Sequence, residues 1–255
     1  MRKIRLLLEY DGSAYKGWQV QKDAVTIQGI LEEKVFRLTG EESPVIGASR
    51  TDAGVHAFGQ VATFRTASHL DAGTIRRALN ALLPQDIRVL AAEEVHDAFH
   101  PRDDALRKRY FYIIVNQRVS SAFLFKYAWI VPQMLDISIM EEASHVLIGK
   151  HDFLAFMGTG SDMKNTVREV CSLGVEKLDR VLFMGVALEG TFIKITAEAN
   201  GFLRHMVRNI VGTLVEIGRG RMPSKKMREI LESRDRKNAG QTSPSNGLFL
   251  ERIDY

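Results

Sequence analysis

Apolar positions in the first hundred residues follow two periods that alternate along the chain. Three short runs rich in Ile, Leu, Val and Phe are bounded by turn residues, a pattern that predicts β-strands. These runs are residues 3–10, 58–65 and 87–95. Between them, apolar side chains three and four positions apart predict helices over residues 26–39 and 71–83. Thr26 and Asp71 stand where N-cap residues are expected, which supports both helix starts.

The second half of the chain shows the same mixture of patterns. Aromatic and β-branched residues predict a strand at 108–116, and three consecutive strands are predicted later. These three are residues 167–178, 181–188 and 192–199, joined by two-residue turns at 179–180 and 190–191. Helical periodicity predicts the remaining elements, which are helices over residues 136–147, 202–217 and 223–233.

Each half therefore combines strands and helices, which is typical of an α+β fold with mixed, mainly antiparallel sheets. We expect two ferredoxin-like or RRM-like subdomains, one over residues 1–104 and one over residues 105–255. No Pro- or Gly-rich linker separates them, so we expect their sheets to join side by side. The active site is then expected in the cleft between the two subdomains.

Composition excludes several other classes of protein. The 255 residues are 45% hydrophobic and 26% charged, which excludes a disordered or fibrous chain. Cys171 is the single cysteine, so the fold contains no internal disulfide and suits a reducing compartment. No apolar stretch reaches the roughly 18 to 20 residues that a membrane helix needs. We therefore predict a cytoplasmic protein without a membrane segment.

Positive charge is concentrated in one segment. The net charge is +4, yet residues 201–240 carry ten Lys or Arg and four Asp or Glu, so this segment is +6 and the rest of the chain −2. A concentrated basic face is typical of proteins that bind a polyanion such as a nucleic acid. A solvated helical surface would give the same count, and charge alone does not separate the two interpretations.

Sequence motifs for common cofactors are absent. The chain has no Gly-x-x-x-x-Gly-Lys-Ser/Thr loop, no Gly-x-Gly-x-x-Gly turn after a strand and no Gly-x-Ser-x-Gly elbow. His96 and His100 are four residues apart, but Pro101 follows at once and disfavours the helix that would place both on one face. We therefore predict a protein that uses no nucleotide cofactor and no metal ion.

The most unusual segment is the polar loop at 47–57, which reads Gly-Ala-Ser-Arg-Thr-Asp-Ala-Gly-Val-His-Ala between two apolar runs. It places Arg50, Asp52 and His56 close together in sequence, and Gly54 allows the backbone a tight turn. Taken by itself, Asp-Ala-Gly is an ordinary turn capped by an aspartate. Its meaning depends on the rest of the chain.

Residues 49–57 of this loop resemble the signature loop of the TruA family of tRNA pseudouridine synthases. Further segments resemble the same family in the same order, and together they cover nearly the whole chain. They are Tyr-Asp-Gly at 10–12, Gly-Trp-Gln-Val-Gln at 17–21, Thr-Ile-Gln-Gly at 26–29, Arg-Lys-Arg-Tyr at 107–110, Gly-Phe-Leu-Arg-His-Met-Val-Arg-Asn-Ile-Val-Gly at 201–212 and Pro-x-x-Gly-Leu-x-Leu at 244–250. Ser243 is a departure, since the family often has Ala before that proline, and we expect it to affect packing and not chemistry.

The resemblance implies isomerisation of uridine to pseudouridine at positions 38, 39 and 40 of the tRNA anticodon stem-loop. This reaction breaks the N-glycosidic bond, turns the uracil and rejoins it through C5, and it consumes no cofactor. Asp52 matches the family's catalytic aspartate, which either attacks covalently or abstracts a ribose proton. Arg208 matches the arginine that pairs with this aspartate, although by position alone it is one more basic residue on an amphipathic helix.

Other residues match the family's roles in handling the RNA. Tyr110 matches the tyrosine that stacks on the target base, although by default it is an ordinary strand aromatic that shares a face with Tyr112. Arg50 matches the residue that fills the space left by the flipped nucleotide. Trp18 is expected to pack in the core. The further residues expected to bind tRNA are Arg204, His205, Arg219, Lys225 and Lys226, with Arg221 and Arg228 beside them.

The leading hypothesis is thus an enzyme of the TruA type, for which the family implies a homodimer that binds one tRNA with both subunits. The alternative is a non-catalytic RNA-binding module of the same fold. That module explains the basic segment, but it has no need of Asp52, because a carboxylate in an RNA-binding cleft repels phosphate. A small α+β enzyme acting on a phosphorylated metabolite explains the charge and none of the motifs.

Overall fold

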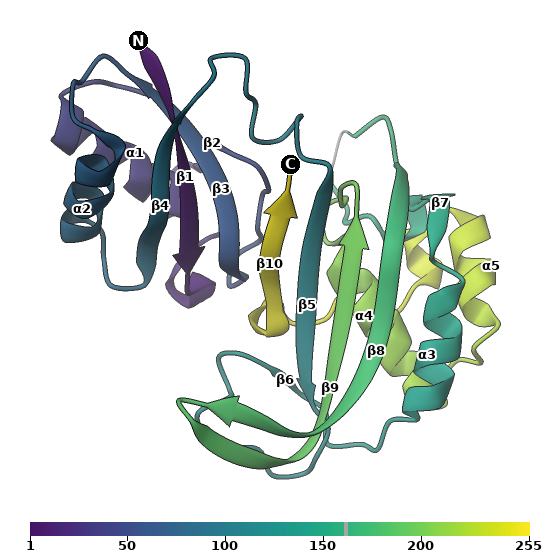
Figure 1. Cartoon of the computed structure of the whole chain (residues 1–255). Helices are drawn as coiled ribbons and strands as arrows, with labels where there is room; N and C mark the ends of the chain where they lie inside the picture. The colour runs from purple at the N-terminus through teal and green to yellow at the C-terminus, as the bar shows by residue number, and fades with distance from the viewer. Residues whose placement is uncertain (161–162) are drawn as a thin grey trace. The chain divides into compact units, whose positions relative to one another are not determined.

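The computed structural model describes residues 1–160 and 163–255. The chain forms two compact units, the first made of residues 1–106 with 249–255 and the second of residues 107–248. Both units combine helices with a mainly antiparallel sheet (Figure 1), which confirms the predicted α+β class. None of the helices described is long and apolar enough to span a membrane.

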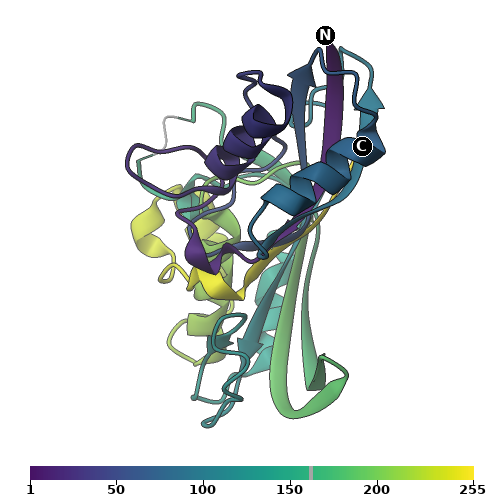
Figure 2. The ribbon, with the colours of Figure 1, turned by 90° about the vertical axis from the view of Figure 1, so that its left-hand side faces the viewer.

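The first unit is a sheet with two helices on one face. Its strands lie in the order β4-β1-β3-β10. They are β1 (Arg2–Tyr10), β3 (His56–Thr66), β4 (Ile87–Val95) and β10 (Leu248–Asp254), with the short β2 (Ile46–Gly47) beside β3 and the short 3-10 helix η1 (Gly12–Ala14) after β1. Helices α1 (Ile27–Thr39) and α2 (Ala72–Leu82) lie in front of this sheet in Figure 2. Alternate residues of β1, namely Ile4, Leu6 and Leu8, are fully buried in the core of the unit.

The last strand lies in the first unit, whereas sequence order places residues 249–255 in the second subdomain. β10 pairs in parallel with β3, so that Phe249 lies opposite His56 and Leu250 opposite Ala57. Pairing between strands so far apart in the chain leaves no local periodicity to detect.

The main strands of the second unit follow the order β5-β9-β8-β7, and each neighbouring pair is antiparallel. The strands are β5 (Arg107–Val115), β7 (Gly149–Asp152), β8 (Val167–Phe183) and β9 (Val186–Ala199), with β6 (Trp129–Ile130) parallel to β5. The helices are α3 (Ile137–His145), α4 (Met206–Gly218) and α5 (Lys226–Ser233), with short 3-10 helices η2 (Leu154–Phe156), η3 (Arg236–Asn238) and η4 (Ser245–Gly247). α4 is buried on nearly every side, so it is a core helix rather than a surface helix with a basic face.

The prediction of three strands after residue 167 is wrong, because the structure contains one long hairpin, β8 and β9. Its turn lies at Met184 and Gly185, which have positive φ of 51° and 80°. The predicted turn at 179–180 coincides with an irregularity in the strand register between Leu178 and Arg180. The predicted turn at 190–191 lies inside β9, where the Gln117 side chain accepts a hydrogen bond from the Thr191 amide (3.1 Å).

The predicted caps of the first two helices are confirmed. The Thr26 hydroxyl accepts a hydrogen bond from the Gly29 amide (3.3 Å), and the Asp71 carboxylate accepts one from the Thr74 amide (2.9 Å). Each cap satisfies an amide that has no partner within its helix. Local chemistry therefore determines where α1 and α2 begin.

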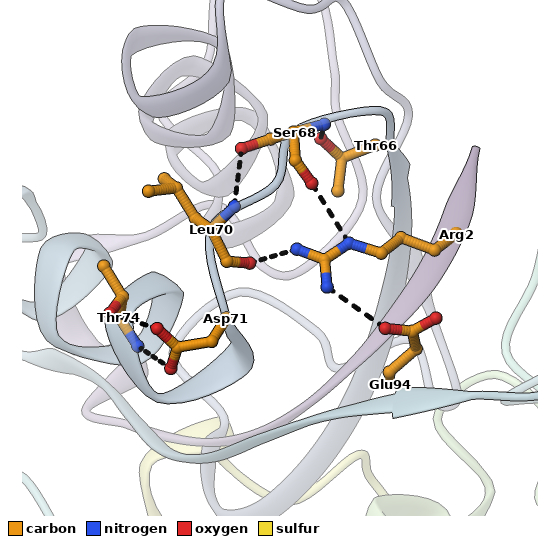
Figure 3. Close-up of polar contacts among 7 residues, drawn as sticks. All are labelled: Arg2, Thr66, Ser68, Leu70, Asp71, Thr74 and Glu94. Carbon is orange, nitrogen blue, oxygen red and sulfur yellow. Dashed lines mark hydrogen bonds and ion pairs between the residues drawn. The ribbon is translucent and has the colours of Figure 1, made fainter.

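Arg2 fastens the connection that leads into α2, as Figure 3 shows. Its guanidinium donates to the Ser68 carbonyl (3.1 Å) and to the Leu70 carbonyl, and it forms an ion pair with Glu94 (3.1 Å) on β4. These contacts hold β1, β4 and the residues before Asp71 together at the edge of the first unit.

Candidate active site

The start of the loop that carries Asp52 is held by hydrogen bonds to β3, the strand that follows it. Gln60 on β3 is fully buried, and its side chain forms two hydrogen bonds with the main chain of Ser49. Its Oε1 accepts from the Ser49 amide (3.2 Å) and its Nε2 donates to the Ser49 carbonyl (2.6 Å). The Ala48 amide also donates to the Val61 carbonyl (2.8 Å). Gln60 was not among the predicted site residues, although a polar Gln in the apolar run 58–65 is a sequence signal for such a role.

The residue before Asp52 is held by both its side chain and its backbone. The Thr51 hydroxyl lies 2.7 Å from the Tyr10 hydroxyl, and the Thr51 carbonyl accepts from the Trp18 amide (3.0 Å). Burial raises the pKa of Tyr10 to about 12, against the opposite effect of its hydrogen bonds to Thr51 and Gln60. Tyr10 therefore stays protonated and keeps this contact at every physiological pH. The contact connects Asp52 to the core of the first unit.

Gly12 and Gly17 allow the backbone of the Asp52 loop to pack directly against the backbone that follows β1. A Cβ at Gly12 would stand 2.0 Å from the Val55 carbonyl oxygen, and one at Gly17 would stand 2.7 Å from the Thr51 carbonyl oxygen. The predicted turn is present, since the Val55 amide donates to the Asp52 carbonyl (3.1 Å). These close approaches leave the backbone of the loop little room to move. Asp52 itself remains partly exposed.

Trp18 and Arg50 have opposite environments near this loop. Trp18 is 1% exposed, as expected for a core residue, and a Cβ at Gly47 would stand 2.4 Å from its indole ring. Arg50 is exposed and lies two residues before Asp52. Of the two, only Arg50 is therefore accessible to a macromolecular substrate.

His56 closes the loop at its C-terminal end. It is 2% exposed, its Nδ1 lies 3.1 Å from Asp11 Oδ1, and its ring stacks on Phe249 at 4.7 Å between centroids. The Gly12 amide lies 3.2 Å from the same nitrogen. His56 thus joins the loop to β10 and to the turn after β1, a structural role that its place in the signature loop did not reveal.

Tyr110 lies in the second unit, on the buried face of β5. It is 5% exposed, and its ring meets Phe202 edge-on, with centroids 5.2 Å apart and planes at 86°. Tyr112 shares this face, as strand alternation predicts, and is fully buried. Burial raises the pKa of Tyr112 above its usual value, and its hydroxyl donates to the Pro244 carbonyl (2.7 Å).

Arg208 lies on the first turn of α4, where it holds the peptide of Ser243. The Arg208 Nε donates to the Ser243 carbonyl (2.8 Å), and the Ser243 amide donates to the Arg208 carbonyl (3.2 Å). Ser243 is fully buried. Because both contacts use main-chain atoms of Ser243, an Ala at this position could form them as well.

Arg204 and His205 lie at the same end of α4. Arg204 is exposed and donates to the Thr159 and Gly160 carbonyls, each at 3.1 Å. His205 has a left-handed backbone (φ 59°), and a Cβ at Gly158 would stand 2.6 Å from its Nδ1. This backbone delays the start of α4 to Met206, four residues after the predicted start.

The remaining predicted residues lie at the other end of α4. Arg219 stands roughly 16 Å from Arg208 along the axis, at about 1.5 Å per residue. Its side chain is 13% exposed, it forms an ion pair with Glu216 (2.8 Å), and it lies over the Trp129 ring. Arg221 also pairs with Glu216, and Lys226 pairs with Glu229 (2.9 Å), whereas Lys225 is exposed. The structure therefore divides the predicted RNA-binding residues of the second unit into two groups.

The structure offers no obvious place for a metal ion in the part of the chain that it describes. Outside residues 161–162, no three His, Cys, Asp or Glu side chains come together in a way that could hold one. His96 and His100, which are four residues apart in the sequence, do not belong to any such group.

Comparison with known proteins matches this chain over its full length. The sequence profile of a family described as tRNA pseudouridine synthase covers residues 7–102 and 143–255. The chain belongs to the tRNA pseudouridine synthase family. It is 46% identical over 255 residues to "tRNA pseudouridine synthase A" of Thermoanaerobacter sp. (strain X514), with 100% of each chain covered. The protein of the same name from Thermodesulfovibrio yellowstonii is 44% identical, and that from Brevibacillus brevis 43%, again with 100% of each chain covered.

Membership of the tRNA pseudouridine synthase family confirms the leading hypothesis at the level of reaction and substrate class. The protein is an isomerase that acts on uridine in tRNA. The roles of Asp52, Arg208 and Tyr110 stay predictions, because they rest on matched motifs. Asp52 belongs to the first unit, and Arg208 and Tyr110 belong to the second.

Proposed function

We propose that this protein isomerises uridines 38, 39 and 40 of the tRNA anticodon stem-loop, with Asp52 as its catalytic residue. The way in which the chain holds Asp52 is the observation that carries the proposal. Gln60, Tyr10 and two glycines fix the residues on both sides of it, while its carboxylate stays partly exposed. A reactive group held in this way can approach a sugar carbon without the entropy cost of first ordering its loop.

The reaction needs one carboxylate beside the target ribose. The N1–C1′ bond breaks, the uracil turns, and a C5–C1′ bond forms. The C5 hydrogen leaves as a proton and N1 gains a proton, so the step balances without a co-reactant. We propose that Asp52 either attacks C1′ or abstracts a ribose proton, and that Arg208 keeps its carboxylate ionised and oriented.

Tyr110 and Arg50 are proposed to handle the target nucleotide. A uridine within a stem must leave the base stack before its sugar can be reached, at a cost of a few kcal/mol. Arg50 occupies the vacated space, because an exposed guanidinium can both stack on bases and bind phosphate. Tyr110 stacks on the flipped uracil, with its ring orientation set in advance by Phe202.

Two basic groups of the second unit are proposed to bind the RNA backbone. Arg204 and His205 form the first, at the start of α4, and Lys225 and Lys226 belong to the second, at the start of α5. Arg219 contributes less than Lys225, because its guanidinium is already paired with Glu216 while Lys225 is exposed. Recognition through the backbone suits three adjacent target uridines, because shape is read more than base sequence.

We further propose that the protein acts in the cytoplasm as a homodimer, with one tRNA touching both subunits. The support for the dimer is the family resemblance. The support for the cytoplasm is the exposed thiol of Cys171, which suits a reducing compartment.

The proposal is tested by tritium release from tRNA that carries 5-tritiated uridine, with the modified positions mapped by sequencing. Release that maps to positions 38 to 40 supports it. Release that maps to another arm of the tRNA keeps the family reaction and overturns the proposed target. No release from any uridine, with tRNA binding intact, would favour the non-catalytic RNA-binding module.

Charge reversal at Lys225 and Lys226 is expected to weaken tRNA binding without changing the chemical step. Lys225→Glu/Lys226→Glu should raise the Kd about tenfold or more and reduce the slope of log Kd against log salt concentration by about two, since each phosphate contact contributes about one. Filter binding at several salt concentrations measures both quantities. The rate at saturating tRNA should stay the same.

Lys177→Glu/Arg180→Glu is the matched control, because it makes the same change in net charge at exposed positions of β8. It should leave the salt slope almost unchanged. Equal effects of the two double variants would show that only total charge matters and would place the RNA contacts elsewhere.

A further inference from the structure

A partly buried polar cluster surrounds the residue that follows Arg208 on α4. Its centre is Asn209, which is fully buried and forms hydrogen bonds through both its amide nitrogen and its amide oxygen. The Asn209 Nδ2 donates to the Phe156 carbonyl (2.8 Å), and its Oδ1 accepts from Arg236 Nη2 (3.0 Å) and from the Thr242 hydroxyl (2.7 Å). Arg236 also donates to the Thr242 hydroxyl (3.0 Å). We call Asn209, Arg236 and Thr242 the Asn209 cluster.

The Asn209 cluster fixes the segment that precedes Pro244. Besides its two contacts to the cluster, Arg236 donates to the Ala239 carbonyl (3.3 Å). The Gly240 amide donates to Thr213 Oγ1 (2.9 Å), and a Cβ at Gly212 would stand 1.7 Å from the Gln241 carbonyl oxygen. Residues 239–242 therefore lie on α4 with no room between the two backbones. Thr242 is the last residue of this segment before Ser243.

Ser243 in turn fixes the plane of the Arg208 guanidinium. A guanidinium is planar, with its five N–H donors in a rigid fork, so a bond from Nε to the Ser243 carbonyl (2.8 Å) sets the direction of both terminal nitrogens. The direction of the Arg208 fork thus depends on a segment far from it in sequence.

We infer that Arg236 is a positioning residue for the reaction, which acts through Thr242 and Ser243 to fix the orientation of the Arg208 guanidinium. This inference rests on the role proposed for Arg208. The hydrogen bonds of Arg236 go to Ala239, Asn209 and Thr242, so its effect on the reaction is exerted through Arg208. Burial lowers the pKa of Arg236 but leaves the side chain charged, so the two hydrogen bonds it makes in the cluster are charge-assisted and strong.

Arg236→Met is expected to reduce the single-turnover rate of pseudouridine formation about tenfold or more, because a misaligned catalytic group loses much of its effect. KM for tRNA should change less than about threefold, since Arg236 is not proposed to contact a phosphate of the RNA. Lys237→Met is the matched control, because it removes one positive charge from the adjacent exposed position. It should leave both quantities unchanged. Thr242→Val, which removes one hydroxyl at equal volume, should act in the same direction as Arg236→Met and is less disruptive to folding.

A double-mutant cycle with Arg208→Lys separates positioning from general destabilisation. If Arg236 acts through Arg208, adding Arg236→Met to Arg208→Lys should lower the rate little further, because the guanidinium that Arg236 orients is already absent. Full additivity of the two losses overturns the inference. A thermal unfolding curve for each variant shows that the comparison is made on folded protein.

Hydrogen exchange of the Arg208 Nε–H, followed by NMR on the full-length protein, reports the positioning independently of activity. The exchange should be about tenfold faster or more in Arg236→Met and in Thr242→Val and unchanged in Lys237→Met. Unchanged exchange in the first two variants overturns the inference. If the exchange responds while Arg208→Lys keeps full activity, Arg236 positions Arg208 and the proposed role of Arg208 is wrong.

Discussion

Asp52→Ala is expected to abolish pseudouridine formation while tRNA still binds. Loss of the only proposed catalytic carboxylate should lower the single-turnover rate by at least about 10³-fold. The Kd for tRNA should stay within about threefold of the wild type or decrease slightly, because a carboxylate beside phosphate opposes binding. Tritium release and filter binding on the same preparation measure the two effects.

Asp52→Asn is the stricter variant, because it keeps the volume of the side chain and leaves the loop contacts of Thr51 and Val55 in place. It should be as inactive as Asp52→Ala and should unfold at the wild-type temperature. A large loss of tRNA affinity in both variants would show that Asp52 mainly shapes the loop. Substantial activity in either variant would remove Asp52 from the reaction.

Gly12→Ala is expected to damage activity and stability together, although Gly12 has no chemical role. Its new methyl group would stand 2.0 Å from the Val55 carbonyl oxygen, so the Asp52 loop must shift. Overpacking of this kind costs about 1–3 kcal/mol of the free energy of unfolding. A shift of about 1 Å in a catalytic group costs about 10²-fold in rate. Thermal unfolding and single-turnover kinetics measure the two losses.

Gly174→Ala is the control for this prediction. Gly174 lies on β8, and a Cβ there would have no heavy atom within 4 Å. The variant should keep wild-type activity and unfold at the wild-type temperature or slightly above it, because Ala restricts the unfolded chain. If Gly12→Ala behaved like Gly174→Ala, the Asp52 loop would be free to move, and the rigid support inferred for it would be wrong.

The family and its reaction were predictable from sequence, since both rest on short contiguous motifs. The nine residues at 49–57 and the twelve at 201–212 were sufficient to name the family, which the comparisons then confirmed. The residues that hold the Asp52 loop and the segment before Ser243 were not predictable, because Gln60, Arg236 and Thr242 carry no motif of their own. They act through contacts with residues far from them in the chain.

Arg219 shows the limit of counting charge. The +6 segment made every basic residue in it a candidate for RNA binding. The structure pairs Arg219 and Arg221 with Glu216, while Lys225 stays exposed. A residue count does not report such pairing, because it depends on where a helix ends and which side chains meet there.

The sequence by itself determined whatever depends on neighbours in the chain: the type of most elements, the caps at Thr26 and Asp71, the turn after Asp52 and the reaction implied by its loop. Propensity, capping and turn formation are local interactions, so they leave a local pattern. Only the tertiary structure decided that β10 belongs to the first unit, that β8 and β9 form one long hairpin and that Ser243 orients Arg208. These features depend on backbone hydrogen bonds and close packing between distant segments, whose partners the linear pattern does not specify.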